Sequence, residues 1–205
     1  MGPAHGATPS PRPGELVSRF VQSEERHPDP DAVSYGTTGR ERFRSGDVLC
    51  FRGRGPLGWL IRTITSSDYS HIGLAYRFEG RVYCLEAVGA GVRLVLMSQL
   101  MGRYRGGIDY FEVEAADEVR RRAISWSFTQ LGKLYDTRGI LHYAWTLLTG
   151  NAERARRDDQ WFCSEFVAAA FARAGLPLVD RAAAYTTPSD LVRAERVRLR
   201  FTLKP

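Results

Sequence analysis

The chain has 205 residues, of which 43% are hydrophobic and 25% charged, and its formal net charge is +6. This length suits one domain with a tail, and the hydrophobic share is enough for a real core. No stretch approaches the roughly 18 continuous apolar residues of a membrane span, and the start lacks the apolar region of a secretory signal. The sequence therefore predicts a cytoplasmic location, and leaves export by another route open.

The positive charge comes almost entirely from arginine, because Lys133 and Lys204 are the only lysines. A basic surface can contact nucleic acid, anionic lipid or an anionic wall polymer. The densest runs, 120–122 and 154–157, alternate with helix formers and are more typical of solvated helix faces. Neither zinc-finger spacing nor a phosphate-binding glycine loop is found. We expect no nucleic-acid partner, cofactor or metal; peripheral membrane contact and oligomeric state stay open.

Residues 1–40 are predicted to form a flexible N-terminal segment. Residues 1–13 are rich in proline, glycine and alanine, which is typical of disorder. Residues 15–25 have the pattern of a short helix, and residues 28–40 that of a linker. The folded domain is expected to cover residues 41–205.

Hydrophobic periodicity predicts the elements of this domain in chain order. Strands are expected at 48–51, 71–78, 81–88, 92–95, 108–114 and 193–203, and helices at 57–64, 98–101, 117–132, 139–149 and from 163. The 117–132 helix is predicted to be capped by Asp117 and to bury Leu131. The apolar 139–149 segment is too short to span a bilayer. It is interpreted as a core helix, or alternatively as a wall of an acyl-binding groove.

Residues 71–88 form the clearest strand pair, with Glu79-Gly80 as a two-residue turn. If Phe78 pairs with Arg81, Glu86 becomes the diagonal neighbour of His71 on one face of the hairpin. A slip of one residue would move Glu86 to the opposite face, so the hypothesis of a His71–Glu86 contact depends on this turn.

Cys163 opens an apolar run, 161–171, that predicts a buried helix ending at Gly175 and Pro177, with Asp158 and Asp159 as candidate caps. A cysteine in the first turn faces the positive end of the helix dipole, which favours thiolate over thiol. The small residues Cys163, Val167, Ala170 and Ala174 form a stripe at helical spacing. We expect this stripe to dock on the face of the hairpin that carries His71, Gly73 and Ala75, and so to bring Cys163 to His71.

These three residues suggest a nucleophile, a base and an orienting group: Cys163, His71 and Glu86. Simpler interpretations stay open for each of them. Cys163 is also consistent with a small core residue, His71 with a hydrogen-bonded strand-end histidine, and Glu86 with a solvated or salt-bridged carboxylate. Cys50 and Cys84 lie in predicted strands and are expected to be core residues.

Six segments in this order resemble the circularly permuted papain-like hydrolases of the NlpC superfamily, in particular the YiiX-like branch. They are residues 46–49, 59–73, 83–87, 135–136, 162–167 and 187–191, and the resemblance spans about residues 42–195. It implies an α+β fold of the permuted papain-like type, in which an antiparallel sheet packs against helices. It also implies a cysteine nucleophile, a histidine base and a polar third member, which by position are Cys163, His71 and Glu86.

The expected function is a cysteine-dependent hydrolase that cleaves an amide bond, in a cell-wall peptide or an N-acyl compound. The resemblance does not fix the substrate. One alternative is a lipid acyltransferase or thioesterase with the same triad, suggested by the apolar 139–149 segment. Another is a catalytically silent binding module with a basic surface.

Overall fold

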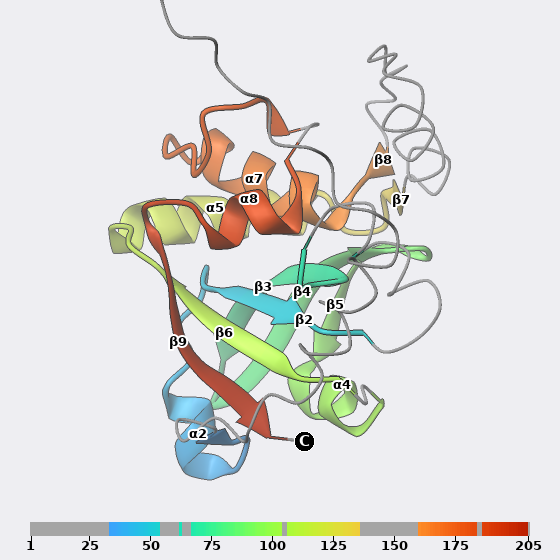
Figure 1. Cartoon of the computed structure of the whole chain (residues 1–205), viewed down its shortest axis with the longest axis vertical. Helices are drawn as coiled ribbons and strands as arrows, with labels where there is room; N and C mark the ends of the chain where they lie inside the picture. Colours follow the sequence, from blue (N-terminus) through green and yellow to red (C-terminus); the bar gives the residue numbers. More distant parts are fainter. Residues whose placement is uncertain are drawn as a thin grey trace, which may run out of the picture. The chain divides into compact units, whose positions relative to one another are not determined.

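A seven-stranded sheet organises the computed structural model, which describes residues 33–53, 62, 67–103, 106–135, 160–183 and 186–204 (Figure 1). The strands are β1 (Val33–Ser34), β2 (Val48–Phe51), β3 (His71–Phe78), β4 (Arg81–Val88), β5 (Gly91–Leu96), β6 (Ile108–Val113), β7 (Leu134–Tyr135), β8 (Gln160–Trp161) and β9 (Val197–Lys204). The helices are α2 (Thr37–Glu41), α4 (Met97–Arg103), α5 (Asp117–Thr129), α7 (Cys163–Arg173) and α8 (Pro188–Val192).

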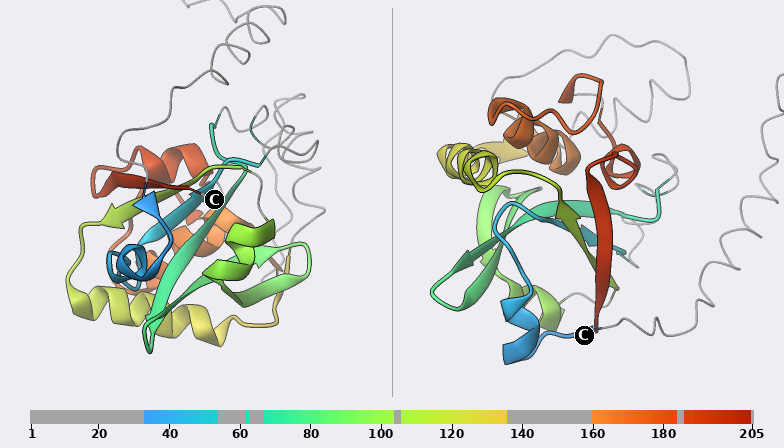
Figure 2. Two further views of the ribbon diagram at one scale, coloured as in Figure 1. Left: turned by 90° about the horizontal axis from the view of Figure 1, so that it is seen from below. Right: turned by 90° about the vertical axis from the view of Figure 1, so that its left-hand side faces the viewer.

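The strand order in the main sheet is β1-β9-β6-β2-β3-β4-β5. All of its pairs are antiparallel except β1 with β9, whereas β7 and β8 form a separate parallel pair. Helices α5, α7 and α8 lie together on one side of the sheet, and α4 lies on the other (Figures 1 and 2). This is the α+β arrangement that the sequence predicts, an antiparallel sheet packed against helices.

The sheet separates two hydrophobic cores, because successive side chains of a strand point to opposite faces. One core, which we call the helix-side core, joins the sheet to α5, α7 and α8; its members include Cys50, Ile72, Leu74, Leu85, Ala87, Ile124, Cys163, Phe166, Val167, Ala170, Ala174 and Leu191. The other, the α4-side core, includes Leu49, Phe51, Ala75, Val82, Cys84, Met97 and Leu100. The strands around β3 are therefore covered on both faces.

The β3–β4 hairpin has the predicted register, with Phe78 opposite Arg81 and Leu74 opposite Leu85. Its turn residues Glu79 and Gly80 both have positive φ angles, 46° and 72°. This combination is typical of the type I′ turn, whose twist matches that of the two strands. The predicted turn is confirmed, and with it the side of the hairpin on which Glu86 lies.

Both ends of the α7 segment are built by local backbone contacts. Phe162 is the N-cap and has an extended conformation. The first hydrogen bond of the helix runs from the N–H of Phe166 to the carbonyl of Phe162. At the other end Gly175 has a φ of 90°, and the N–H of Leu176 bonds the carbonyl of Phe171 at 3.0 Å. This is a Schellman motif, which requires glycine at the left-handed position. The sequence prediction that Gly175 ends the helix is confirmed.

Three local predictions are wrong. The sequence predicts a linker up to residue 40, but residues 33–41 form β1 and α2, because β1 pairs with the last strand, β9. Asp117 is the first helical residue of α5, and Ala116 is its N-cap. Leu131 is 41% exposed, since α5 ends at Thr129 and the helical phase stops before it. The expectations for residues 1–32, the helix at 57–64, the segment at 139–149 and the caps Asp158 and Asp159 lie outside the described residues.

A buried ion pair ties the sheet to α5. Asp47 is fully buried and accepts hydrogen bonds from the Arg120 guanidinium, the Tyr110 hydroxyl and the N–H of Val113. Arg120 also donates to the carbonyls of Val113 and Ala115. A buried charge requires such full pairing, because an unpaired one carries a large desolvation cost.

Replacing Asp47 with alanine is therefore expected to lower the free energy of unfolding by about 3–5 kcal/mol, because Arg120 would remain buried without its counter-charge. Urea unfolding measures this loss, and Asp180→Ala, at an exposed carboxylate, is the matched control. A loss below about 1 kcal/mol for Asp47→Ala would show that the pair is no stronger than a surface salt bridge.

Candidate active site

Cys163 is the first residue of α7 and is only 6% exposed. The strand β8 leads into the helix through Phe162, so the cysteine lies where an extended segment turns into a helix. The N–H groups of a first helical turn have no partners within the helix, and they form the positive end of the helix dipole. The first turn is held in place by Ser164, whose hydroxyl donates to the carbonyl of Thr186 at 2.6 Å.

Cys163 lies near enough to His71 for its thiol to raise the pKa of the imidazole. The predicted docking face of α7 is wrong, however. The helix packs on the side of Ile72 and Leu74, in the helix-side core, and not on the side of Gly73 and Ala75.

The space beside Gly73 is filled by its own sheet, which explains the different docking face. A Cβ at Gly73 would lie 2.6 Å from the Cys84 sulfur and 3.3 Å from the Glu86 Cβ. The missing side chain thus makes room for β4 and leaves no groove for a helix. His71 still reaches Cys163 because it opens β3, where its side chain lies at the end of the sheet and remains 16% exposed.

Glu86 lies on β4 and binds His71 as the hairpin register predicts. Its Oε2 is 2.8 Å from Nε2 of His71. Because this ring nitrogen is engaged by Glu86, Nδ1 is the one available to the Cys163 sulfur. The imidazole therefore lies between the Glu86 carboxylate, to which it is hydrogen-bonded, and the Cys163 thiol, which raises its pKa.

This position changes the proton affinity of both ionisable partners. Burial by itself would lower the pKa of His71, but its hydrogen bonds with Cys163 and Glu86, and their negative charges, outweigh burial and raise the pKa to about 10. Burial would raise the pKa of Glu86, but His71 and then Arg93 outweigh it and hold that pKa below its ordinary value. The arrangement thus favours an imidazolium beside an ionised carboxylate at neutral pH.

The sequence prediction missed Arg93, the second cationic partner of Glu86. Arg93 lies on β5 directly opposite Glu86, and its Nε and Nη2 donate to Oε1 at 2.9 and 2.7 Å. A signal for it was present in the chain, because Gly89-Ala90 is a two-residue turn between Val88 and Gly91. Continuing that register places Arg93 beside Glu86.

Contacts of Ser70 and Phe51 fix the end of the sheet at which His71 lies. Ser70 donates from its N–H to the carbonyl of Phe51 at 2.9 Å and accepts from the N–H of Gly53 at 2.7 Å. Phe51 pairs with His71 across the sheet, and its ring centre lies 5.2 Å from that of the imidazole. These contacts fix the beginning of β3 on the end of β2 and so fix the His71 backbone.

The other two thiols differ from Cys163 in their surroundings. Cys50 and Cys84 are fully buried, and all three cysteines are free. Burial, together with the nearby carboxylates Asp109 for Cys50 and Glu86 for Cys84, raises the pKa of both thiols well above the ordinary value. Both are therefore poor nucleophiles at neutral pH.

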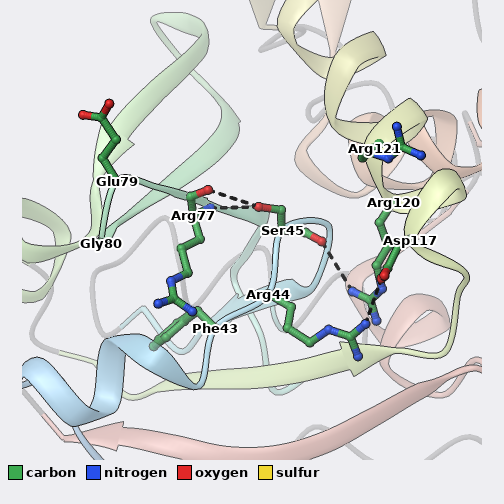
Figure 3. Close-up of a pocket in the computed structure, with 9 residues that line it drawn as sticks. All are labelled: Phe43, Arg44, Ser45, Arg77, Glu79, Gly80, Asp117, Arg120 and Arg121. Atoms are coloured by element: carbon green, nitrogen blue, oxygen red, sulfur yellow. Dashed lines mark hydrogen bonds and ion pairs between the residues drawn. The ribbon is translucent and has the colours of Figure 1, made fainter.

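A pocket of about 480 Å³ lies at the far end of β3 from His71 (Figure 3). It is lined by Phe43, Arg44, Ser45, Arg77, Glu79, Gly80, Asp117, Arg120 and Arg121. Three of its arginines are already paired with carboxylates, namely Arg44 with Glu112 and Asp117, Arg120 with Asp47, and Arg121 with Glu118. Strand rise places Arg77 roughly 20 Å from His71, so this pocket is separate from the thiol.

Comparison with known proteins identifies the family. A family model described as "Permuted papain-like amidase enzyme, YaeF/YiiX, C92 family" matches residues 42–190. The chain therefore belongs to this family, a group of cysteine peptidases and amidases with a permuted papain-like fold, as the sequence resemblance predicts.

Two Escherichia coli proteins are similar to this chain. The "Probable lipoprotein peptidase YaeF" of strain K12 is 27% identical over 178 residues, which cover 73% of this chain and 63% of that protein. This chain thus spans less than two thirds of that relative's length. The crystal structure of "metalloprotein yiiX" from strain O157:H7 has a TM-score of 0.61 and 20% identity, and covers 79% of this chain and 98% of that one. At this identity the likeness shows the fold alone.

The second of these relatives is called a metalloprotein, which raises the question of whether this chain has a metal site. Its described residues contain no group of three or more His, Cys, Asp or Glu side chains arranged to hold an ion. Within the same part of the chain, no helix combines the length and apolar character needed to cross a bilayer.

Iodoacetamide at neutral pH is expected to alkylate Cys163 well before Cys50 and Cys84, since those two thiols are fully buried and their pKa values are raised well above that of an ordinary thiol. Mass spectrometry of the three cysteine peptides over time measures the order. Denatured protein is the control, in which the three rates should converge. Equal or slower labelling of Cys163 in the folded protein would contradict the prediction.

Proposed function

We propose that this member of the family is a cysteine-dependent amidase in which Cys163 is the nucleophile, His71 the acid and base, and Glu86 the group that orients His71. The observation that carries the proposal is the position of the His71 imidazole between the Glu86 carboxylate, 2.8 Å from its Nε2, and the Cys163 thiol, which raises the pKa of His71. A nucleophile, a base and an orienting group in hydrogen-bond contact are the recurring arrangement of covalent hydrolases.

Acylation begins from the thiolate of Cys163 and the imidazolium of His71. The sulfur attacks the carbonyl carbon of the amide, and its electron pair forms the C–S bond while the carbonyl π electrons move to oxygen. When this oxyanion collapses, the C–N bond breaks and His71 gives its proton to the leaving amine. The products of this half-reaction are a free amine and a thioester on Cys163.

Deacylation uses the same groups in the opposite proton direction. Neutral His71 takes a proton from water, the hydroxide attacks the thioester carbon, and the thiolate leaves as the acid is released. In both halves the oxyanion would lie near the N–H of Cys163, where the α7 dipole favours negative charge. Glu86 keeps the imidazole in one orientation and stabilises its charged form.

The proposed substrate is an amide of a cell-wall peptide or of an N-acyl compound. Two observations support an amide: the matching family is described as an amidase, and the relative from strain K12 is named a peptidase. The excess of arginine is consistent with an anionic partner such as a wall polymer. An acyltransferase or thioesterase would use the same three side chains, so the substrate test has to separate these activities.

The roles of the triad predict different losses for its members. His71→Ala is expected to lower kcat/KM by about 100- to 10,000-fold, because it removes the acid and base. Glu86→Gln keeps the shape and should cost about ten-fold, the effect of roughly one pKa unit. Cys163→Ala should be inactive. Steady-state kinetics with a released-amine assay measures all three.

The pH profile tests the same assignment. The wild-type rate of acylation should fall as the pH rises through about 10, where His71 loses the proton that the leaving amine needs. Because the charge of Glu86 helps to raise that pKa, Glu86→Gln should move the fall to lower pH. Equal losses for the His71 and Glu86 variants, or unfolding of Glu86→Gln, would favour a purely structural carboxylate.

A substrate panel separates amide from ester chemistry. We expect release of free amines from short wall peptides and N-acyl compounds, and slower or no hydrolysis or transfer of fatty-acyl esters. Cys163→Ala is the control for adventitious activity. Preferred turnover of the acyl esters would replace the amidase assignment by the lipid one. Turnover of neither class by a protein whose Cys163 is readily alkylated would refute the proposed substrate and leave the proposed site.

A further inference from the structure

We propose that Arg93 is a positioning residue of the thiol site, which holds Glu86 in place and keeps it ionised while His71 gains and loses its proton. The proposal rests on the proposed function of Cys163, His71 and Glu86. It assigns a role to a residue of β5, an edge strand of the sheet, and this residue touches neither Cys163 nor His71 in the hydrogen bonds of the described residues.

The two oxygens of Glu86 are divided between two cations. Oε1 accepts from Nε and Nη2 of Arg93 at 2.9 and 2.7 Å, and Oε2 is 2.8 Å from Nε2 of His71. With two donors from a rigid guanidinium on one oxygen, the carboxylate plane has little freedom to rotate. Arg93 therefore directs Oε2 toward the imidazole.

A permanent counter-charge is required because Glu86 is only 1% exposed. A buried carboxylate without a cation is strongly disfavoured and would take up a proton. The groups that face Glu86 among the described residues are His71 from β3, Arg93 from β5 and the thiol of Cys84, 3.9 Å away on its own strand. His71 is neutral for part of each turnover, whereas arginine keeps its charge at all relevant pH values.

The position of Arg93 is set by backbone contacts and does not depend on burial of its own side chain. Gly91 has a φ of 107°, and a Cβ there would lie 2.6 Å from the carbonyl oxygen of Lys133. This close approach lets Val92 donate to that carbonyl at 2.8 Å and accept from the N–H of Gly132 at 2.9 Å. The segment after α5 thus fixes the start of β5, and with it the residue opposite Glu86.

The exposure of Arg93 makes the proposal testable. Its side chain is 45% exposed, so its truncation leaves no large cavity. An ordinary exposed ion pair contributes only about 0–1 kcal/mol to stability. Such a pair would not change the reactivity of Cys163, which is separated from Arg93 by Glu86 and His71. A positioning residue, in contrast, changes the reactivity of Cys163 while the fold remains stable.

The test measures alkylation of Cys163 by iodoacetamide across a range of pH, because this readout needs no substrate. In Arg93→Ala, Glu86 should protonate at higher pH and stop stabilising the imidazolium. The alkylation rate of Cys163 near neutral pH should therefore fall about ten-fold, and its acidic limb should move to higher pH. Arg93→Lys should give an intermediate rate, since it keeps the charge and loses the second donor.

Two controls distinguish an effect of the Arg93 side chain at its position from a general effect of removing a positive charge. Arg81→Ala, at an exposed arginine of the neighbouring strand β4, removes the same charge and should leave the rate unchanged. Guanidinium ion below denaturing concentration should partly restore the rate of Arg93→Ala, and sodium ion should not. For a substrate that is turned over, Arg93→Ala should lower kcat more than it raises KM.

An unchanged alkylation rate and pH profile in Arg93→Ala, combined with slower alkylation in Glu86→Gln, would overturn the role of Arg93 alone. Unchanged rates in both Glu86→Gln and His71→Ala would instead overturn the proposed function on which this inference rests. If Arg93→Ala unfolds, Arg93→Lys and Arg93→Gln decide: equal alkylation rates in these two would refute the proposal, and a faster rate in the lysine variant would support it.

Discussion

The buried carboxylate of Glu86 is the constraint on which the proposed site depends. Its burial would favour the neutral acid, and only its contacts with His71 and Arg93 keep its pKa low. The charge retained in this way holds the imidazole, whose pKa is raised by Glu86 and by the Cys163 thiol. A charge at one position of β4 thus supports the role that we propose for a sulfur at the start of α7.

The sheet order explains how these residues come together. Strands β3, β4 and β5 are consecutive in the sheet, and each contributes one residue: His71, Glu86 and Arg93. Both connections are two-residue turns, which fix the register without freedom to slide. The helix that carries Cys163, α7, follows these strands much later in the sequence and packs on the face of the sheet opposite Gly73. Cys163 and His71 therefore approach each other at the end of the sheet.

Local patterns in the sequence are sufficient where a short-range rule determines the structure. The Glu79-Gly80 turn fixes the pairing of Phe78 with Arg81, and that pairing predicts the His71–Glu86 contact. The docking face of α7 could not be predicted in the same way. Gly73 has no side chain, and the sequence does not say whether the vacant space receives a helix or, as found, Cys84 and Glu86 of the adjacent strand.

The charges that the proposed chemistry requires also stabilise the folded protein. The signs of the two pKa shifts define the pH range over which each charge contributes. The pKa of His71 is raised from 6.5 to about 10, so its contribution is fully present below about 6.5 and is lost as the pH rises through 10. The pKa of Glu86 is lowered from 4.5, so its contribution is present above 4.5 and is lost as the pH falls through the folded value. Both contributions persist near neutral pH, where imidazolium and carboxylate face each other. Because Cys163 is itself one cause of the raised pKa, the acid–base behaviour of His71 belongs to the three residues together and changes when any one of them is replaced.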